Sequence, residues 1–389
     1  MVARDRVNLV MMGGLHSPVV QPTGTLTTNT RGEASMPDAS TRAVLLIGTI
    51  PLPSSALVFE AVGARLGGLA PAVPDGETGP RLAWIGWQFG RLKHLETLQM
   101  AAEMPLGGKE LPQTVPVLKL RKGVKTTDLN LHPLGYCDEA IKSYSAFKEA
   151  KARGRLPAST RFQVSIPSAL ILSTVIQDGD PRGLLAAFER AAIDEVRDIC
   201  EAIPHEELAI QWDMVEPEAE EYRRHPGAGK PLLKQLRLWW SYEEGAASIG
   251  RISAAIPASV NLGVHLCYGD PDGTHVIEPH DGSVLRDIAN ALSVSIPRRL
   301  DWIHMPVPIE RHDDAYFAPF RTLKLAPETR IYLGLVHQED GTEGAAQRIA
   351  AARKVIPNFG VATECGLGRL PPNTIGYVLD LYRKVAELP

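Results

Sequence analysis

From residue 43 onward, short apolar runs alternate with longer segments whose hydrophobic residues recur at helical spacing. The first run, AVLLIGTIPL at 43–52, predicts a strand that ends in a Gly/Pro turn. Ser54 and Ser55 can cap a helix directly after it, because their hydroxyls accept hydrogen bonds from the first backbone amides. The apolar positions of this helix are Val58, Phe59, Val62 and Leu66. The pattern therefore opens with a strand and an amphipathic helix.

The same alternation continues to the C-terminus. Strands are predicted within 160–170, 207–218, 260–267, 300–305, 330–336 and 359–363, and helices at 183–203, 231–256, 283–296, 343–355 and 373–387. Strands that alternate with helices imply a parallel sheet covered by helices. The predicted fold class is α/β, a (β/α)8 TIM barrel formed by a single domain at 38–389. The irregular stretch 91–160 is expected to hold long βα loops or an inserted helical hairpin. A doubly wound open sheet is the alternative, although the Gly-rich phosphate fingerprint is missing after the first strand.

The first 37 residues differ from the rest of the chain. They are rich in Thr, Ser, Gly and Pro and show neither a helical nor a strand period. We expect 1–37 to form a disordered extension. It lacks the charged start and continuous apolar core of a secretion signal. Met36 is an alternative start of the chain.

Composition narrows the classes of partner. The 389 residues carry a formal net charge of −4, and 44% of them are hydrophobic. No basic patch stands out, which argues against nucleic acid as a partner. No apolar run approaches the roughly 20 residues needed to cross a membrane, so a soluble protein is expected. The four cysteines are too few and too scattered for a disulfide scaffold, which favours a reducing cytoplasm.

Polar residues collect where the predicted strands end, which in a barrel is the position of the active site. The segment PDGETGPR, placed after the first strand, offers Asp75, Glu77 and Arg81, and later strand ends offer Asp213, Glu216, His265, Cys267, His304, His337, Glu339, Asp340, Glu364, Cys365 and Arg369. His265 and Cys267 are two positions apart, so a strand presents both side chains on one face. They are either two buried residues or half of a metal site. With Cys365 they would suit Zn2+ with an open fourth position.

Two of these motifs resemble a known family. VHLCYGD and VATECGLGR resemble the zinc motifs of the cobalamin-independent methionine synthase family, within the wider grouping that includes uroporphyrinogen decarboxylase. The resemblance implies that His265, Cys267 and Cys365 are zinc ligands. LLIGTIPLP is similar to the opening strand of that family, and the order of motifs agrees from residue 43 to residue 387.

Three further segments resemble parts of that family that carry substrate-binding or catalytic residues. DGETGPR resembles the segment whose glutamate holds the amino-acid substrate, here Glu77. IQWDMVEP resembles the strand that ends in an aspartate, here Asp213, and LGLVHQED resembles the segment that carries a histidine, here His337. The resemblance implies that Glu77 and Asp213 position the substrate's amine or hydroxyl groups. His337 would transfer a proton, since an unperturbed pKa near 6.5 suits that role.

The chain departs from the family at the fourth zinc ligand. Aligned by eye, Pro306 stands where the family has a glutamate. His304, two positions earlier on the same strand face, is the predicted replacement, and Glu310 is an alternative in the loop. Two alternatives remain: the metal has three protein ligands, or no metal binds. The chain holds one barrel where full-length methionine synthases carry two, which argues against a folate methyl donor.

Four further residues are candidates for binding the substrate. Trp84 and Trp87 offer aromatic surface for a flat apolar or aromatic substrate, although both also fit a core position. Arg81 and Arg369 are candidates for binding substrate carboxylates. The expected partner is a small molecule, with a thiol as one candidate, and related barrels often pair as homodimers.

Three enzyme classes follow from these residues. The leading hypothesis is a zinc-dependent transferase that moves a methyl or small carbon group to a thiol, because zinc lowers the pKa of a thiol and presents a thiolate. The second is a zinc-dependent lyase or acyl-transfer enzyme acting on a β-keto or aromatic acid, with a coenzyme thiol as a candidate acceptor. The third is a metal-free decarboxylase. A non-enzymatic binding barrel is the remaining alternative.

Overall fold

A computed structural model describes residues 41–106, 113–226, 229, 239–269 and 273–389. The predicted N-terminal extension, 1–37, lies outside these described residues. Among them, seven strands form one parallel sheet. In order across the sheet they are β1 (Ala72–Pro74), β4 (Arg161–Pro167), β5 (Leu208–Met214), β6 (Asn261–Leu266), β7 (Trp302–Pro306), β8 (Arg330–Gly334) and β9 (Gly360–Val361). Adjacent strands of this sheet therefore follow one another along the chain, except that two strands outside the sheet are inserted between β1 and β4.

The first apolar run occupies the eighth strand position. Val44 forms a parallel bridge with Val361 of β9, and the Leu45 amide donates to the Val361 carbonyl at 3.0 Å. On the other side, the Ile50 amide donates to the carbonyl of Gly76, just beyond β1, at 2.8 Å. This segment therefore joins both edges of the sheet, and the predicted α/β barrel is confirmed. The sequence predicts a full strand within 43–52, whereas the structure has an extended segment with a single β-bridge at Val44.

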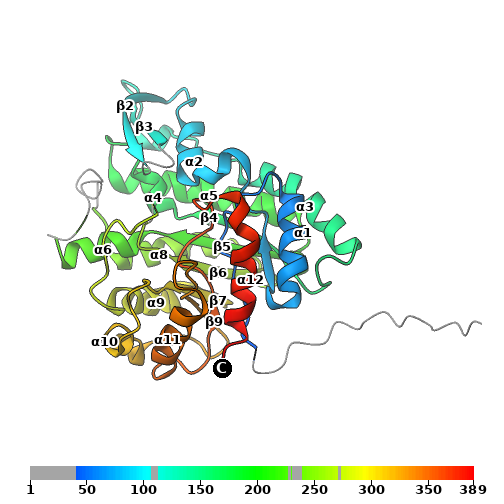
Figure 1. Ribbon diagram of the computed structural model, residues 1–389. Helices are drawn as coiled ribbons and strands as arrows, with labels where there is room; N and C mark the ends of the chain where they lie inside the picture. Colours follow the sequence, from blue (N-terminus) through cyan, green and yellow to red (C-terminus); the bar gives the residue numbers. More distant parts are fainter. Residues whose placement is uncertain (1–40, 107–112, 227–228, 230–238, 270–272) are drawn as a thin grey trace, which may run out of the picture. The chain divides into compact units, whose positions relative to one another are not determined.

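Helices follow the strands and cover the outside of the sheet (Figure 1). The longer ones are α1 (Ser55–Leu66), α3 (Tyr136–Ala152), α5 (Pro181–Ala202), α6 (Glu216–Arg224), α8 (Tyr242–Ser253), α9 (Ser283–Ser295), α11 (Gly341–Arg353) and α12 (Ile375–Ala386); the shorter ones are α2 (Ile85–Leu92), α4 (Ala169–Ser173) and α10 (Asp314–Phe317). The hydroxyl of Ser54 caps α1 by accepting from the Leu57 amide, as the sequence predicts. The first helix, α1, packs against the last, α12, which matches the ring closure seen in the strands (Figure 1).

Two parts of the first third of the chain differ from the sequence-based prediction. The three-residue strand β1 was not predicted, so PDGETGPR follows the second strand position and not the first. The irregular stretch holds an antiparallel pair, β2 (Leu98–Leu106) and β3 (Gln113–Leu120), followed by α3. The long-loop expectation for 91–160 therefore holds, whereas the helical hairpin is wrong. Of the predicted helix 231–256, residues 231–238 lie outside the described residues; in the described part, α8 begins at Tyr242 and ends at Ser253, so the predicted helix is too long at both ends.

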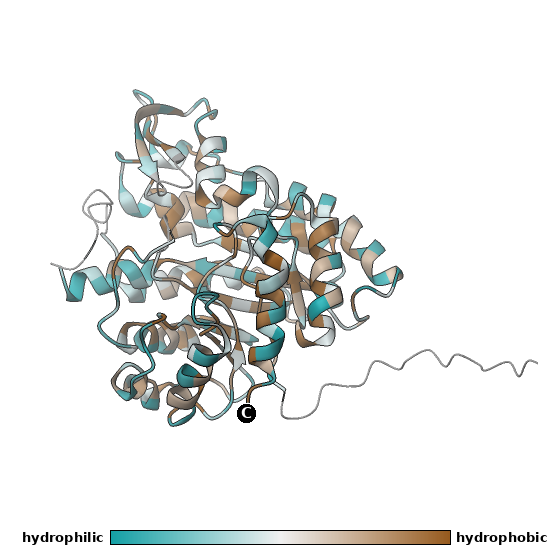
Figure 2. Ribbon diagram, viewed as in Figure 1, coloured by the Kyte–Doolittle hydropathy of each residue, from teal (hydrophilic) through white to brown (hydrophobic). Residues whose placement is uncertain are grey.

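The strands are buried on both faces, as parallel strands covered by helices must be. Alternate residues pack outward against the helices, whose outer surfaces are more hydrophilic (Figure 2). The inward residues form a smaller cluster that includes Leu45, Ile47, Trp302 and Tyr332. Gly263 makes room for the Trp302 indole, because a Cβ at 263 would lie 1.8 Å from a ring carbon. None of the helices among the described residues combines the length and apolarity needed to span a membrane.

Candidate functional site

Three neighbouring strands place polar side chains in one row inside the barrel. Asp213 on β5 is in register with His265 on β6, which is in register with His304 on β7. Cys267 follows His265 by two positions and points to the same face, just beyond the end of β6. All four lie at the carboxyl end of the sheet, where a barrel of this type places its chemistry.

His265, Cys267 and Cys365 meet at one point. Their candidate ligand atoms all lie within 4.8 Å of one another, and the two sulfur atoms are 3.9 Å apart. Two thiolates on one tetrahedral zinc ion, each bonded at about 2.3 Å, are separated by about 3.8 Å. A disulfide would require about 2 Å. The donor set and its spacing therefore fit a zinc ion.

His304 supports this group from behind. Its Nδ1 lies 2.8 Å from Nδ1 of His265, and its Nε2 donates to the carbonyl of Thr363 at 3.0 Å. Burial lowers the pKa of His304 to about 3, so the ring is neutral and carries one proton. The carbonyl can only accept, which assigns that proton to Nε2. Nδ1 of His304 therefore accepts from Nδ1–H of His265, and Nε2 of His265 keeps a free lone pair for a metal.

The predicted fourth ligands are not brought to the group. His304 lies outside the three residues that gather, and both of its ring nitrogens already have partners. Glu310 is exposed. Gly334 explains how His304 fits, because a Cβ there would lie 2.8 Å from His304 Nε2 and 2.9 Å from the Thr363 carbonyl oxygen. The geometry favours a three-residue donor set with an open fourth position.

A cavity opens beside the three ligands. Its empty volume is about 1220 Å³, a figure that includes open solvent at the mouth. Its carboxylic side chains are Glu77, Asp213 and Glu218, and its cation is Arg369. Apolar side chains complete the wall, among them Ile47, Leu82, Trp84, Ile85, Phe89 and Ile171. The site therefore combines a soft metal donor set, acids and a largely apolar surface.

Glu77 lies in a turn whose conformation is fixed by hydrogen bonds. Its backbone φ is 47°, which is rare for a residue with a side chain, and its amide donates to Asp75 Oδ1 at 2.9 Å. Arg81, in the short 3₁₀ turn Gly79–Ala83, holds Asp75 with two hydrogen bonds of 3.2 and 2.7 Å. Strained backbone that is fixed in this way is common at functional sites. Arg81 thus lines a small cavity behind Glu77, and not the main one.

The two central acids hold protons unusually strongly. Burial raises the pKa of Glu77 well above its ordinary value, and the nearby Asp213 raises it further. Burial also raises the pKa of Asp213 to about 7, against the opposing effect of a hydrogen bond that Gln211 donates at 2.9 Å. Two neighbouring buried acids with raised pKa values are suited to exchange protons with a substrate or to bind its ammonium group.

The remaining predicted residues fall in different places. Trp84 lines the cavity and, like Glu77, has a positive φ of 46°. Trp87 does not line it; its ring packs edge-on against Tyr136, with Arg91 over its face. Arg369 lines the cavity. His337 lies outside the cavity lining and donates from Nε2 to the Val307 carbonyl at 2.9 Å.

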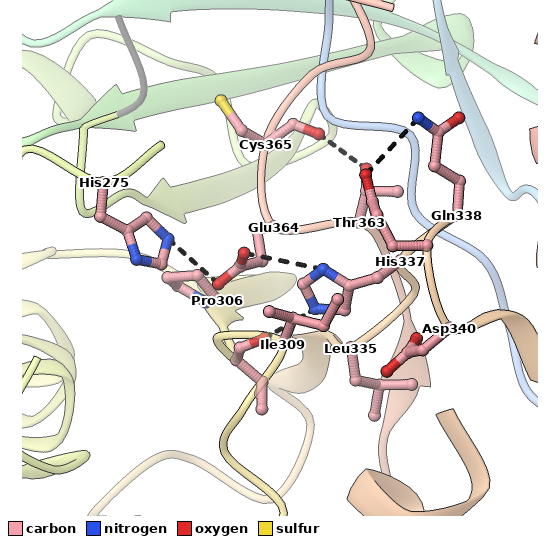
Figure 3. A network of polar contacts seen from close by, with 12 residues as sticks. His275, Pro306, Ile309, Leu335, His337, Gln338, Asp340, Thr363, Glu364 and Cys365 are labelled. Carbon is pink, nitrogen blue, oxygen red and sulfur yellow. Dashed lines mark hydrogen bonds and ion pairs between the residues drawn. The ribbon is translucent and has the colours of Figure 1, made fainter. Parts of the chain in front are cut away.

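His337 belongs to a separate polar network beside the ligand Cys365. Figure 3 shows the Glu364 carboxylate between the imidazole rings of His275 and His337, with separations of 3.3 and 3.8 Å. Burial alone would lower the pKa of His275, but hydrogen bonds to Glu278 and Glu364 outweigh it and raise the pKa to about 10. His275 is therefore charged at neutral pH and holds Glu364 in place.

Two residues of this region were missed from the sequence. Glu218 lines the cavity, whereas only its neighbour Glu216 was singled out at that strand end. His275 lies in a loop of mixed composition that carries no motif. The signal for Glu218 was its place one turn after a strand end, and four glutamates share that turn and the next. The sequence does not say which of them faces inward.

Comparisons with known proteins agree with this architecture. No protein-family model and no curated protein sequence matches the chain. Solved structures do match it, among them a candidate vitamin-B12 independent methionine synthase from Listeria monocytogenes, with a TM-score of 0.50 and 14% identity over 85% of this chain and 86% of that one. Another is a B12-independent methionine synthase from Shewanella sp. W3-18-1 in complex with selenomethionine, with a TM-score of 0.53 and 12% identity over 89% of this chain and 96% of that one. At these identities the likeness establishes a shared fold.

Proposed function

We propose that the protein is a zinc-dependent transferase that moves a methyl or other small carbon group to a substrate thiol. The observation that carries the proposal is the meeting of His265 with two sulfur atoms 3.9 Å apart at the wall of a cavity. The B12-independent methionine synthase fold of the two neighbours supports the same class of reaction. A small-molecule thiol is the proposed acceptor, in a chain expected to work in the cytoplasm.

The residues that would hold zinc are His265, Cys267 and Cys365. When bound, zinc supplies Lewis acidity that lowers the pKa of a substrate thiol. Glu77 and Asp213 would hold the amine or hydroxyl groups of the substrate, because both acids face the cavity. Trp84 and its apolar neighbours would exclude water from the reacting carbon, which favours transfer over hydrolysis.

The first experiment measures zinc per chain by elemental analysis. We expect about one zinc in the wild type and almost none in Cys267→Ala and Cys365→Ala. Cys200→Ala is the matched control, since Cys200 is a buried cysteine on α5 away from the cavity. A wild type that takes up no zinc, even after incubation with it, would remove the basis of this proposal.

Thiol binding is tested on the cobalt-substituted protein. Cysteamine, 2-mercaptoethanol and homocysteine should each change the cobalt absorption spectrum, with a new thiolate-to-metal band for any thiol that occupies the fourth position. Methyl thioether formation is then followed by mass spectrometry with a panel of methyl donors. A cobalt spectrum indifferent to every thiol would contradict the acceptor assignment.

A zinc-dependent lyase or acyl-transfer reaction is the second candidate, and Arg369 in the cavity lining favours it. An arginine beside acids with raised pKa values suits a substrate with a carboxylate whose neighbouring carbon gains or loses a proton. This candidate predicts release of a carboxylic acid from a panel of β-keto acids without any methyl donor. A reaction that survives chelation of all metal would instead support a metal-free decarboxylase.

A further inference from the structure

The two cysteines of the proposed metal site follow strands that are not neighbours in the sheet. Cys267 lies just after β6 and Cys365 lies in the segment after β9, and β7 and β8 stand between these strands. The hydrogen bonds of the sheet therefore connect the two cysteine segments only through two other strands. Direct contacts between the segments can control the 3.9 Å separation of the sulfur atoms more tightly.

His275 contacts the segment that carries Cys267. Its ring packs edge-on against the ring of the buried Tyr268, with 5.6 Å between the two centroids. The amide of Val276 donates to the carbonyl of Gly269 at 3.1 Å, which joins the backbone next to His275 to the same segment. His275 is thus held beside the residue that directly follows Cys267.

The same histidine contacts the segment that carries Cys365. Nε2 of His275 lies 3.3 Å from Glu364 Oε1, and its Nδ1 lies 3.1 Å from Glu278 Oε2. Figure 3 shows the contact with Glu364 and the neighbouring Cys365. The side chains of His275 and Glu364 are only 11% and 21% exposed, so water and salt screen this ion pair less than a pair on the open surface. Glu364 is therefore restrained directly before Cys365.

We propose that His275 is a positioning residue for the metal site: with Tyr268 and Glu364 it forms a clamp that holds the two cysteine segments at the separation zinc requires, before zinc binds. The assignment deepens the proposed function and rests on its zinc ligands. His275, Tyr268 and Glu364 lie outside the cavity lining, so the clamp acts through the cysteines and not on the substrate. A site that is ordered in advance loses less conformational entropy when its metal binds.

The separation of the thiols can be tested on the metal-free protein. Phenylarsine oxide bonds two neighbouring thiols at once: two As–S bonds form, and the oxygen leaves as water with both thiol protons. The wild type should bind it tightly and Cys365→Ala should not, because a single thiol cannot chelate arsenic. His275→Phe keeps a ring beside Tyr268 but loses both contacts with carboxylates. It should bind the arsenical about 10-fold more weakly, the low end of the range for residues that support a metal ligand.

Zinc affinity, measured by competition with a chromophoric chelator, is the second readout. His275→Phe should lower it by about 10-fold as well. His275→Gln should lose less, because its amide can still donate to Glu364, and it serves as the test variant if His275→Phe does not fold. Glu364→Leu should also weaken zinc binding. The double variant should lose clearly less than the product of the two single losses, since each substitution opens the same clamp.

His280→Phe is the matched control. His280 follows His275 in the same loop, but its side chain is 71% exposed and its ring stacks on that of His225. This variant should leave the affinities for zinc and for the arsenical unchanged. Losses as large as those of His275→Phe would indicate a general effect of the loop and would overturn the clamp.

The remaining outcomes separate the clamp from the proposed function. A folded His275→Phe protein with both affinities unchanged would refute the clamp and leave the transferase standing. If the wild type binds the arsenical but no zinc, the proposed function fails, whereas weaker arsenical binding by His275→Phe still supports the clamp. If zinc binding changes as expected but no methyl donor reacts, the transferase fails and the clamp stands.

Discussion

Replacement of the His304 imidazole by a ring without nitrogen should weaken metal binding and leave the three proposed metal ligands in place. In His304→Phe, the buried Nδ1–H of His265 loses its acceptor and the Thr363 carbonyl loses its donor, because one ring serves both at 2.8 and 3.0 Å. The His265 ring is then free to rotate or to take the other tautomer. Loss of such a supporting partner typically costs 10- to 100-fold in metal affinity, or about 1.4–2.8 kcal/mol.

The same substitution should also destabilise the metal-free protein. Each buried polar group left without a partner costs about 1–3 kcal/mol, so the free energy of unfolding should fall by roughly 2–6 kcal/mol if neither group finds water. His304→Gln serves as the conservative comparison. Its amide oxygen can accept from His265 while its amide nitrogen donates to Thr363, so both losses should be smaller.

Two measurements separate these effects. Zinc affinity is determined by competition with a chromophoric chelator at pH 7.5, and stability is determined by urea unfolding of the metal-free protein. A folded His304→Phe protein that binds zinc within twofold of the wild type would refute the supporting role. A loss of affinity as complete as that of Cys267→Ala would instead indicate that His304 is itself a ligand.

Three further predictions follow from the same structure. Gly334→Ala should weaken zinc binding by about 10-fold, the low end of the range for supporting residues, because its Cβ would lie 2.8 Å from His304 Nε2; chelator competition that shows unchanged affinity would count against it. Glu221→Gln should stabilise the metal-free protein increasingly as pH rises from about 4.5 to about 7, since a raised carboxyl pKa penalises the folded state in that window, and the gain should reach roughly 2–3 kcal/mol. Urea unfolding at pH 5 and pH 8 checks this, and equal gains at both would contradict it. Arg81→Ala should lower the stability of the substrate-free protein by about 3 kcal/mol because the buried carboxylate of Asp75 loses its counter-ion; unchanged stability with a raised KM would make Arg81 a substrate ligand.

The sequence predicts the repeating elements well because their patterns are long and regular. The helix at α5 and the strand β5 follow directly from helical spacing and from a continuous apolar run. The strand β1 is missed because three residues carry no period. The pair β2 and β3 is missed because its residues show no clear alternation, with Pro105 and Pro116 inside the two strands.

The site is predictable only as far as local geometry determines it. The two-residue period of a strand places His265 and Cys267 on one face, and this needs no knowledge of other strands. The contact between His265 and His304 depends on the register of β6 against β7, which the sequence does not encode in any short motif. Trp84 and Trp87 differ for a similar reason. Trp84 has a positive φ and lines the cavity, whereas Trp87 packs against Tyr136, and the sequence does not show this difference.

The proline at position 306 changes the charge expected for a zinc site. The resemblance to the methionine synthase family places a carboxylate ligand there, which would give a zinc site with two thiolates and one imidazole a net charge of −1. Here the nearest polar residue on that strand face is His304, whose neutral ring is turned to His265. A zinc ion held by His265, Cys267 and Cys365 would carry no net charge. A neutral centre attracts an incoming thiolate more strongly than an anionic one, so in the proposed enzyme the replacement would favour thiol binding and would leave the fourth position open.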